Sequence, residues 1–150
     1  MSNEPPEILL VGDPLEVISF TLGGRTSRAT RRGFALLWEF ERRAQKRWPG
    51  CVFRIVQPAC NTGVTASAGT HDKADVWDWV LDGVDNWRAE SNLARACGLA
   101  DWVRDPSQGF AWHHHAVGRG LPLDMYGDLV PGQLVDYGNH ALGLRGGHAC

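Results

Sequence analysis

The sequence has little excess charge and no long apolar run. Its 150 residues carry 15 Lys and Arg against 17 Asp and Glu, which gives a net charge of -2 with neutral histidines. That balance offers no basic surface of the kind that nucleic acids or anionic membranes attract. No stretch approaches the ~20 consecutive apolar residues of a membrane-spanning helix, so no such helix is predicted.

Two further features are missing. The N-terminal segment carries acidic residues, among them Glu4 and Glu7, where a signal peptide has basic ones. We therefore expect synthesis in a cytoplasm without a signal peptide. The cysteines lack the Cys-x-x-Cys spacing of a zinc ribbon and are interpreted as reduced thiols. They are Cys51, Cys60, Cys97 and Cys150.

The composition is that of a folded protein, with 43% hydrophobic and 21% charged residues. Its length predicts a single domain over 1–150, with a lead-in over 1–27 and a core over 28–144. Apolar residues at 3–4 spacing predict a helix over 33–50, and a second helix is expected from Asn86 to about Gly98. Strands are predicted over 51–59, 76–83 and 111–118, loops over 22–33 and 61–75, and a short helix from about Gly132. The fold class is α+β, a small, mostly antiparallel sheet with flanking helices.

Three consecutive histidines stand in the last predicted strand. Side chains alternate along a strand, so His113 and His115 share one face and His114 points to the other. His71 precedes the strand that contains Asp78, and two neighbouring strands could bring His71, Asp78 and His115 together. Imidazole and carboxylate ligands suit zinc, and three of them leave a fourth position open, as catalytic sites do.

The residues alone also allow a plainer interpretation. His113 and His115 would be ordinary half-buried side chains, and Asp78 would pair with another group. Asp78 lies between Trp77 and Trp79, however, and a buried carboxylate without a partner is costly. A cation is the simplest partner.

The motifs resemble those of the M15 family of zinc peptidases. The residues that carry the resemblance are N-x-G-V-x-A-S-A-G-T-H-D over 61–72, Asp78 after six intervening residues, and W-x-x-H-A-V over 112–117. The family belongs with D-alanyl-D-alanine peptidases, lysostaphin-type enzymes and hedgehog domains, and cell-wall peptidases (endolysins) of phages of actinobacteria look most similar. The resemblance extends from about Arg28 to Leu144.

This resemblance implies a hedgehog/D-Ala-D-Ala peptidase-like fold and a peptidase that cuts peptidoglycan stem or cross-link peptides, as a phage lysin does after release from the cell. It implies that His71, Asp78 and His115 bind Zn2+ and that His113 is the catalytic residue. The expected partner is the peptidoglycan peptide substrate; no nucleic acid and no stable membrane association are expected, and of the possible oligomeric states we expect a monomer. Gln57, Asn61 and Ser67 lie in or before the loop that leads to His71, where they would either bind substrate or satisfy loop backbone groups.

The sequence also departs from the family pattern. Lys73, Ala74, Asp75 and Val76 stand where the family has glycines and a small residue, and we expect Asp75 to add charge close to the metal. Trp112 replaces the acid found three residues before the last ligand in many relatives, so activity would rest on His113. His114 is expected to be exposed. The alternative function is an inactive zinc-binding module of the same fold, which binds cell-wall peptide or serves as a structural part of a phage.

Overall fold

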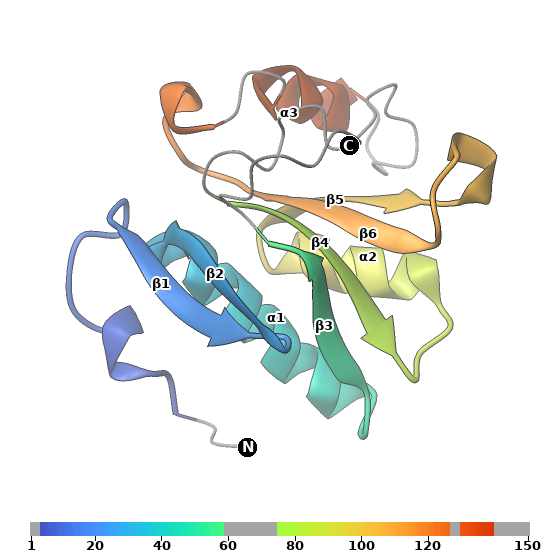
Figure 1. Ribbon diagram of the computed structural model, residues 1–150, viewed down its shortest axis with the longest axis horizontal. Coiled ribbons are helices and arrows are strands. Elements are labelled where there is room, and N and C mark those ends of the chain that lie inside the picture. Colours follow the sequence, from blue (N-terminus) through green and yellow to red (C-terminus); the bar gives the residue numbers. More distant parts are fainter. Residues whose placement is uncertain (1–3, 59–74, 127–129, 140–150) are drawn as a thin grey trace.

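The computed structural model describes residues 4–58, 75–126 and 130–139. Within these ranges the chain is mixed α+β, as predicted, with two antiparallel sheets and three α-helices (Figure 1). One sheet is the pair β1–β2, and the other has the strand order β3-β4-β6-β5. Three short 3-10 turns complete the described part: Glu7–Leu9, Pro106–Gln108 and Leu123–Met125. None of the helices in these ranges has the length and apolarity needed to cross a membrane.

The first sheet is a hairpin of β1 (Val17–Leu22) and β2 (Arg25–Thr30). Its turn consists of Gly23 and Gly24, whose φ angles of +61° and +73° are the left-handed values that a two-residue hairpin turn needs. The prediction of a loop over 22–33 was therefore wrong. Strand β2 reads R-T-S-R-A-T, and polar residues occupy not only its exposed positions but also the buried positions of Ser27 and Thr30, so the segment lacks the apolar alternation that reveals a strand.

Helix α1 (Arg31–Arg47) confirms the predicted first helix and begins two residues earlier. Thr30 caps its N-terminus by accepting a hydrogen bond from Gly33 N. Its buried residues follow the expected spacing, with Phe34, Leu37 and Phe40 in the core. The Phe34 ring stacks on Phe20 of β1, which fixes the hairpin against the helix.

The three strands predicted for the larger sheet are present as β3 (Val52–Gln57), β4 (Val76–Asp82) and β6 (His113–Gly118). Helix α2 (Trp87–Ala96) confirms the second helix. The strand β5 (Leu99–Arg104) was not predicted. All its residues are buried, so the sequence L-A-D-W-V-R shows no alternation of polar and apolar residues. Gly98, with a φ of +100°, makes the sharp change from helix to strand.

The larger sheet is covered on both faces (Figure 1). The face that carries Trp77, Trp79 and Leu81 packs in the main core with α1 and α2, and is called here the helix-pair face. The opposite face, called here the α3 face, carries Val76 and packs in a smaller core with residues of α3 (Val130–Asn139). The alternation predicted for residues 76–81 is therefore confirmed. Asp78 and the two outer histidines of β6 belong to the α3 face.

Candidate metal centre

Asp78 and His115 meet on the α3 face because of the register between their strands. They are direct partners in the antiparallel pair β4–β6. His115 Nδ1 lies 3.0 Å from Asp78 Oδ1, and both residues are buried. The alternation of side chains predicted which residues share a face within each strand. The register between β4 and β6 shows that Asp78 and His115 lie side by side on the same face of the sheet.

His113 approaches the same carboxylate from the same strand face. Its Nε2 lies 3.5 Å from Asp78 Oδ2, within ion-pair distance, but makes no hydrogen bond with the described part of the chain. Its Nδ1 lies 2.8 Å from the carbonyl oxygen of Ala111. A carbonyl oxygen can only accept, so Nδ1 carries the proton, and in the neutral ring Nε2 holds the lone pair. His113 therefore presents a buried basic nitrogen beside Asp78.

Helix α3 contributes a contact that the sequence did not predict. Gln133 is fully buried, and its Oε1 lies 3.0 Å from Nε2 of His115. The Trp102 ring of β5 lies beside His115 at a centroid distance of 5.6 Å. His115 is thus enclosed between its strand partners and α3, with one ring nitrogen turned to Asp78 and the other to Gln133.

The donor atoms around Asp78 suit a zinc ion. Two ligand atoms that each lie about 2.0–2.1 Å from a tetrahedral zinc are about 3.3 Å apart. The separation between the two described ligand atoms, Asp78 Oδ1 and His115 Nδ1, is 3.0 Å, a few tenths of an ångström below that value. Within residues 4–58, 75–126 and 130–139 no group of three His, Cys, Asp or Glu side chains is placed to hold a metal ion. The third predicted ligand, His71, lies outside the described residues.

Of the three residues predicted to bind substrate, Gln57 can be placed. It is the partner of Asp78 on the other side of β4, after a bulge that follows Ile55. Its Nε2 is buried and makes no hydrogen bond with the part of the chain that the structure describes. A buried amide donor therefore belongs to the strand partner of Asp78. Asn61 and Ser67 fall outside the described ranges.

The expectation that His114 is exposed was wrong. The side chain is fully buried on the helix-pair face, where its ring stacks on Trp79 at a centroid distance of 3.8 Å. Its Nδ1 lies 2.8 Å from Asp101 Oδ2 and its Nε2 lies 3.3 Å from Glu90 Oε1. Burial alone lowers the pKa of His114, but the two carboxylates outweigh this effect and raise the pKa to about 8.

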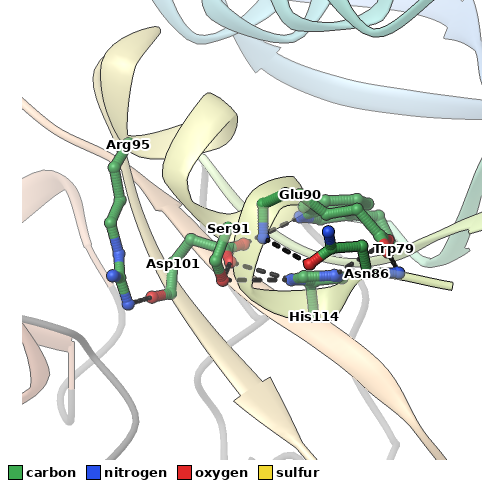
Figure 2. A network of polar contacts seen from close by, with 8 residues as sticks. Trp79, Asn86, Glu90, Ser91, Arg95, Asp101 and His114 are labelled. Carbon is green, nitrogen blue, oxygen red and sulfur yellow. Dashed lines mark hydrogen bonds and ion pairs between the residues drawn. The ribbon is translucent and has the colours of Figure 1, made fainter. Parts of the chain in front are cut away.

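Figure 2 shows that these groups form one polar network between α2, β4, β5 and β6. Asp101 accepts hydrogen bonds from Trp79 Nε1, at 3.0 Å, and from the Ser91 hydroxyl. Sequence reasoning did not single out Asp101, because β5 itself was not predicted. Glu90, Ser91 and Ala94 lie on one face of α2, which is buried. The spacing of Glu90 and Ser91 one helical turn before Ala94 was the sequence signal for this buried face.

Asp75 does not lie where its charge was expected to act. Its carboxylate accepts hydrogen bonds from Thr30 N, at 2.9 Å, and from Thr30 Oγ1, at 2.6 Å, at the start of α1. The residue is buried with a φ of 65°, and burial raises its pKa to about 6. A Cβ atom on Gly33 would collide with this carboxylate. Asp75 thus connects the entry of β4 to the N-terminus of α1.

Comparison with known proteins adds no relative to this picture. No family model matches the chain, and no curated protein or solved structure matches it either. What the described residues define is an α+β protein with an Asp–His pair and a second histidine on one covered sheet face. The functional argument rests on these residues and on the motifs of the chain.

Proposed function

We propose that the chain is a zinc-dependent peptidase that hydrolyses stem or cross-link peptides of peptidoglycan, a lysin of the M15-like type with a hedgehog/D-Ala-D-Ala peptidase-like fold. It would be made by a phage in the host cytoplasm and act on the cell wall after release. The observation that carries the proposal is the register that pairs Asp78 with His115 and brings His113 to the same carboxylate. These residues are the described members of the motifs that resemble the M15 family.

His71, Asp78 and His115 would hold the zinc ion. When bound, zinc acts as a Lewis acid toward a peptide carbonyl and lowers the pKa of water into the neutral range. Two of the three ligands come from adjacent strands of a covered sheet, so their side chains have little freedom to move. Such rigid positioning is what a catalytic metal site requires.

His113 would be the general base. The Ala111 carbonyl holds the proton on Nδ1, so the Nε2 lone pair is available to accept a proton from the attacking water. The Asp78 carboxylate, 3.5 Å from Nε2, stabilises the resulting imidazolium. The same nitrogen can then return the proton to the leaving amine. No covalent intermediate is needed in this sequence of steps.

The substrate would lie at the end of the edge strand β3, beside Gln57. The buried Nε2 of Gln57 can donate a hydrogen bond to a carbonyl or carboxylate of a stem peptide. Because Gln57 is the strand partner of Asp78, a group bound to this nitrogen would lie beside the metal ligand. Asn61 and Ser67 stay predictions for the same role.

The test measures zinc content and hydrolysis of purified peptidoglycan, with products identified by mass spectrometry, in the presence and absence of a chelator. His113→Ala is expected to retain zinc and to lose at least about 100-fold in hydrolysis, as loss of a general base typically does. Asp78→Asn is expected to lose zinc. Asp82→Asn is the matched control, since this carboxylate lies in the same strand but is half-exposed and paired with Arg54.

Full hydrolysis by His113→Ala would contradict the assignment of the base. Hydrolysis that no chelator reduces would contradict the zinc mechanism. Zinc bound by the wild-type protein without any cleavage of peptidoglycan would instead support the alternative, a non-enzymatic module of the same fold that binds cell-wall peptide or serves in a phage particle.

A further inference from the structure

We propose that Gln133 is a positioning residue for zinc, which selects the ring nitrogen that His115 presents to Asp78. This inference rests on the proposed zinc site. It concerns a residue from a helix that the metal-binding motifs do not include.

The argument begins with two contacts of the His115 ring. Nε2 lies 3.0 Å from Gln133 Oε1, and Nδ1 lies 3.0 Å from Asp78 Oδ1. Both facing atoms are oxygens that can only accept, because Gln133 offers its carbonyl and Asp78 its carboxylate. A neutral imidazole has one N–H and one lone pair, so it cannot donate to both.

The orientation of the Gln133 amide determines which of the two nitrogens carries the proton. If Nε2–H donates to Gln133, the lone pair of Nδ1 faces a carboxylate oxygen at 3.0 Å, and a cation between them turns repulsion into attraction. Zinc ligands require this form of the ring, with a bare nitrogen toward the metal and the second N–H held by an outer partner. Gln133 therefore prepares the His115–Asp78 pair for a cation.

The opposite orientation of the amide makes a different prediction. With the Gln133 amide reversed, its Nε2 would donate to His115, and Nδ1–H would donate to Asp78. The pair would then be a neutral hydrogen-bonded contact with no lone pair for a metal. The two orientations can be separated by a side chain at position 133 that can only accept.

The surroundings of Gln133 make this contact specific. The side chain is fully buried, and its Nε2 makes no hydrogen bond with the described part of the chain. Gln133 lies on α3 between Val130 and Leu134, which pack in the core on the same sheet face. The helix is thereby docked by apolar contacts, while Gln133 adds a polar contact that reaches His115.

The experiment measures zinc affinity by competition with a chromophoric chelator, together with the unfolding midpoint of the metal-free protein. Gln133→Met keeps the length of the side chain and removes the acceptor, and its zinc affinity is expected to fall about 10- to 100-fold. Gln133→Glu keeps an acceptor and is expected to bind zinc at least as tightly as the wild-type protein. Leu134→Ala is the control for packing, because it weakens α3 docking without altering the contact with His115.

Unchanged zinc affinity in Gln133→Met would overturn the inference. So would a loss in Gln133→Glu equal to that in Gln133→Met, because it would mean that an acceptor at position 133 does not support zinc binding. A loss in Leu134→Ala as large as that in Gln133→Met would also overturn it, because general packing of α3 would then explain the effect. If the wild-type protein binds no zinc, the proposed function itself fails, which differs from each of these results. Should Gln133→Met not fold, Gln133→Glu and Leu134→Ala still decide the question.

Discussion

Substitution of Asp75 by Asn should change how the stability of the protein depends on pH. Burial raises the pKa of Asp75 from 3.8 to about 6, although hydrogen bonds from Thr30 act in the opposite direction. The folded protein therefore holds this proton more tightly than the unfolded chain does. It follows that the contribution of Asp75 to stability is fully present below pH 3.8 and is lost as the pH rises through 6.

The magnitude follows from the distance between the two pKa values. Each pKa unit corresponds to about 1.4 kcal/mol at 25 °C, so the free energy of unfolding should lose about 2.4 kcal/mol between pH 4 and pH 7 through this carboxyl alone. The side chain introduced by Asp75→Asn cannot ionise, and asparagine tolerates the left-handed φ of 65° at this position. Its carbonyl can accept from Thr30 N, and its amide can donate to Thr30 Oγ1, so the connection to α1 is retained.

The assay is denaturant unfolding of the metal-free protein, followed by tryptophan fluorescence, at several pH values from about 4 to 7.5. The variant should gain about 2.4 kcal/mol relative to the wild-type protein across this range. Asp82→Asn is the control with the opposite sign: the hydrogen bond from Arg54 lowers the pKa of Asp82, so that carboxylate stabilises the fold above its unfolded pKa and the benefit is lost as the pH falls. A difference between Asp75→Asn and wild type that is the same at both ends of the pH range would refute the reasoning.

Two further substitutions probe the fold around the site. His114→Ala removes the imidazole between the buried carboxylates of Asp101 and Glu90. It should lower the free energy of unfolding, measured by urea denaturation, by about 3–5 kcal/mol. A loss below about 1 kcal/mol would show that His114 does not form a charged pair with these carboxylates. Gly98→Ala forces a side chain into a φ of +100° and places its Cβ 3.1 Å from Leu36 Cδ2, so a loss of about 1–3 kcal/mol is expected in thermal unfolding, and wild-type stability would contradict it.

Local patterns predicted the parts of the fold whose apolar residues recur at regular spacing. Helix α1 was found from the spacing of Phe34 and Leu37, and β4 from the alternation of tryptophans with smaller residues. Strand β5 escaped because both its faces are buried, and β2 because polar residues occupy buried as well as exposed positions. In both strands the pattern of polar and apolar residues depends on which other elements pack against the strand. A short window of sequence does not contain that information.

The alternation of side chains along a strand predicted which site residues share a face within one strand, but not which strands are neighbours. Parity placed His113 and His115 on one face and Asp78 on a face of its own strand, and only the register between β4 and β6 joined them. The contact of Gln133 with His115 spans eighteen residues and depends on how α3 docks, so it could not be foreseen. Predicting the burial of His114 would have required knowing that its strand partner is Trp79.

Strand β6 carries the same residue type at three successive positions, so histidine itself does not determine how the strand aligns. A slip by one residue would still present imidazoles on both faces of the sheet, although it would reverse every side chain. The alignment is set instead by the two residues that follow, since Ala116 lies opposite Trp77 and Val117 lies opposite Val76. A larger residue at position 116 would be crowded by its strand partner Trp77. We expect this crowding to disturb the alignment that brings the histidines to Asp78. The register that pairs Asp78 with His115 thus depends on a residue, Ala116, whose side chain is a single methyl group.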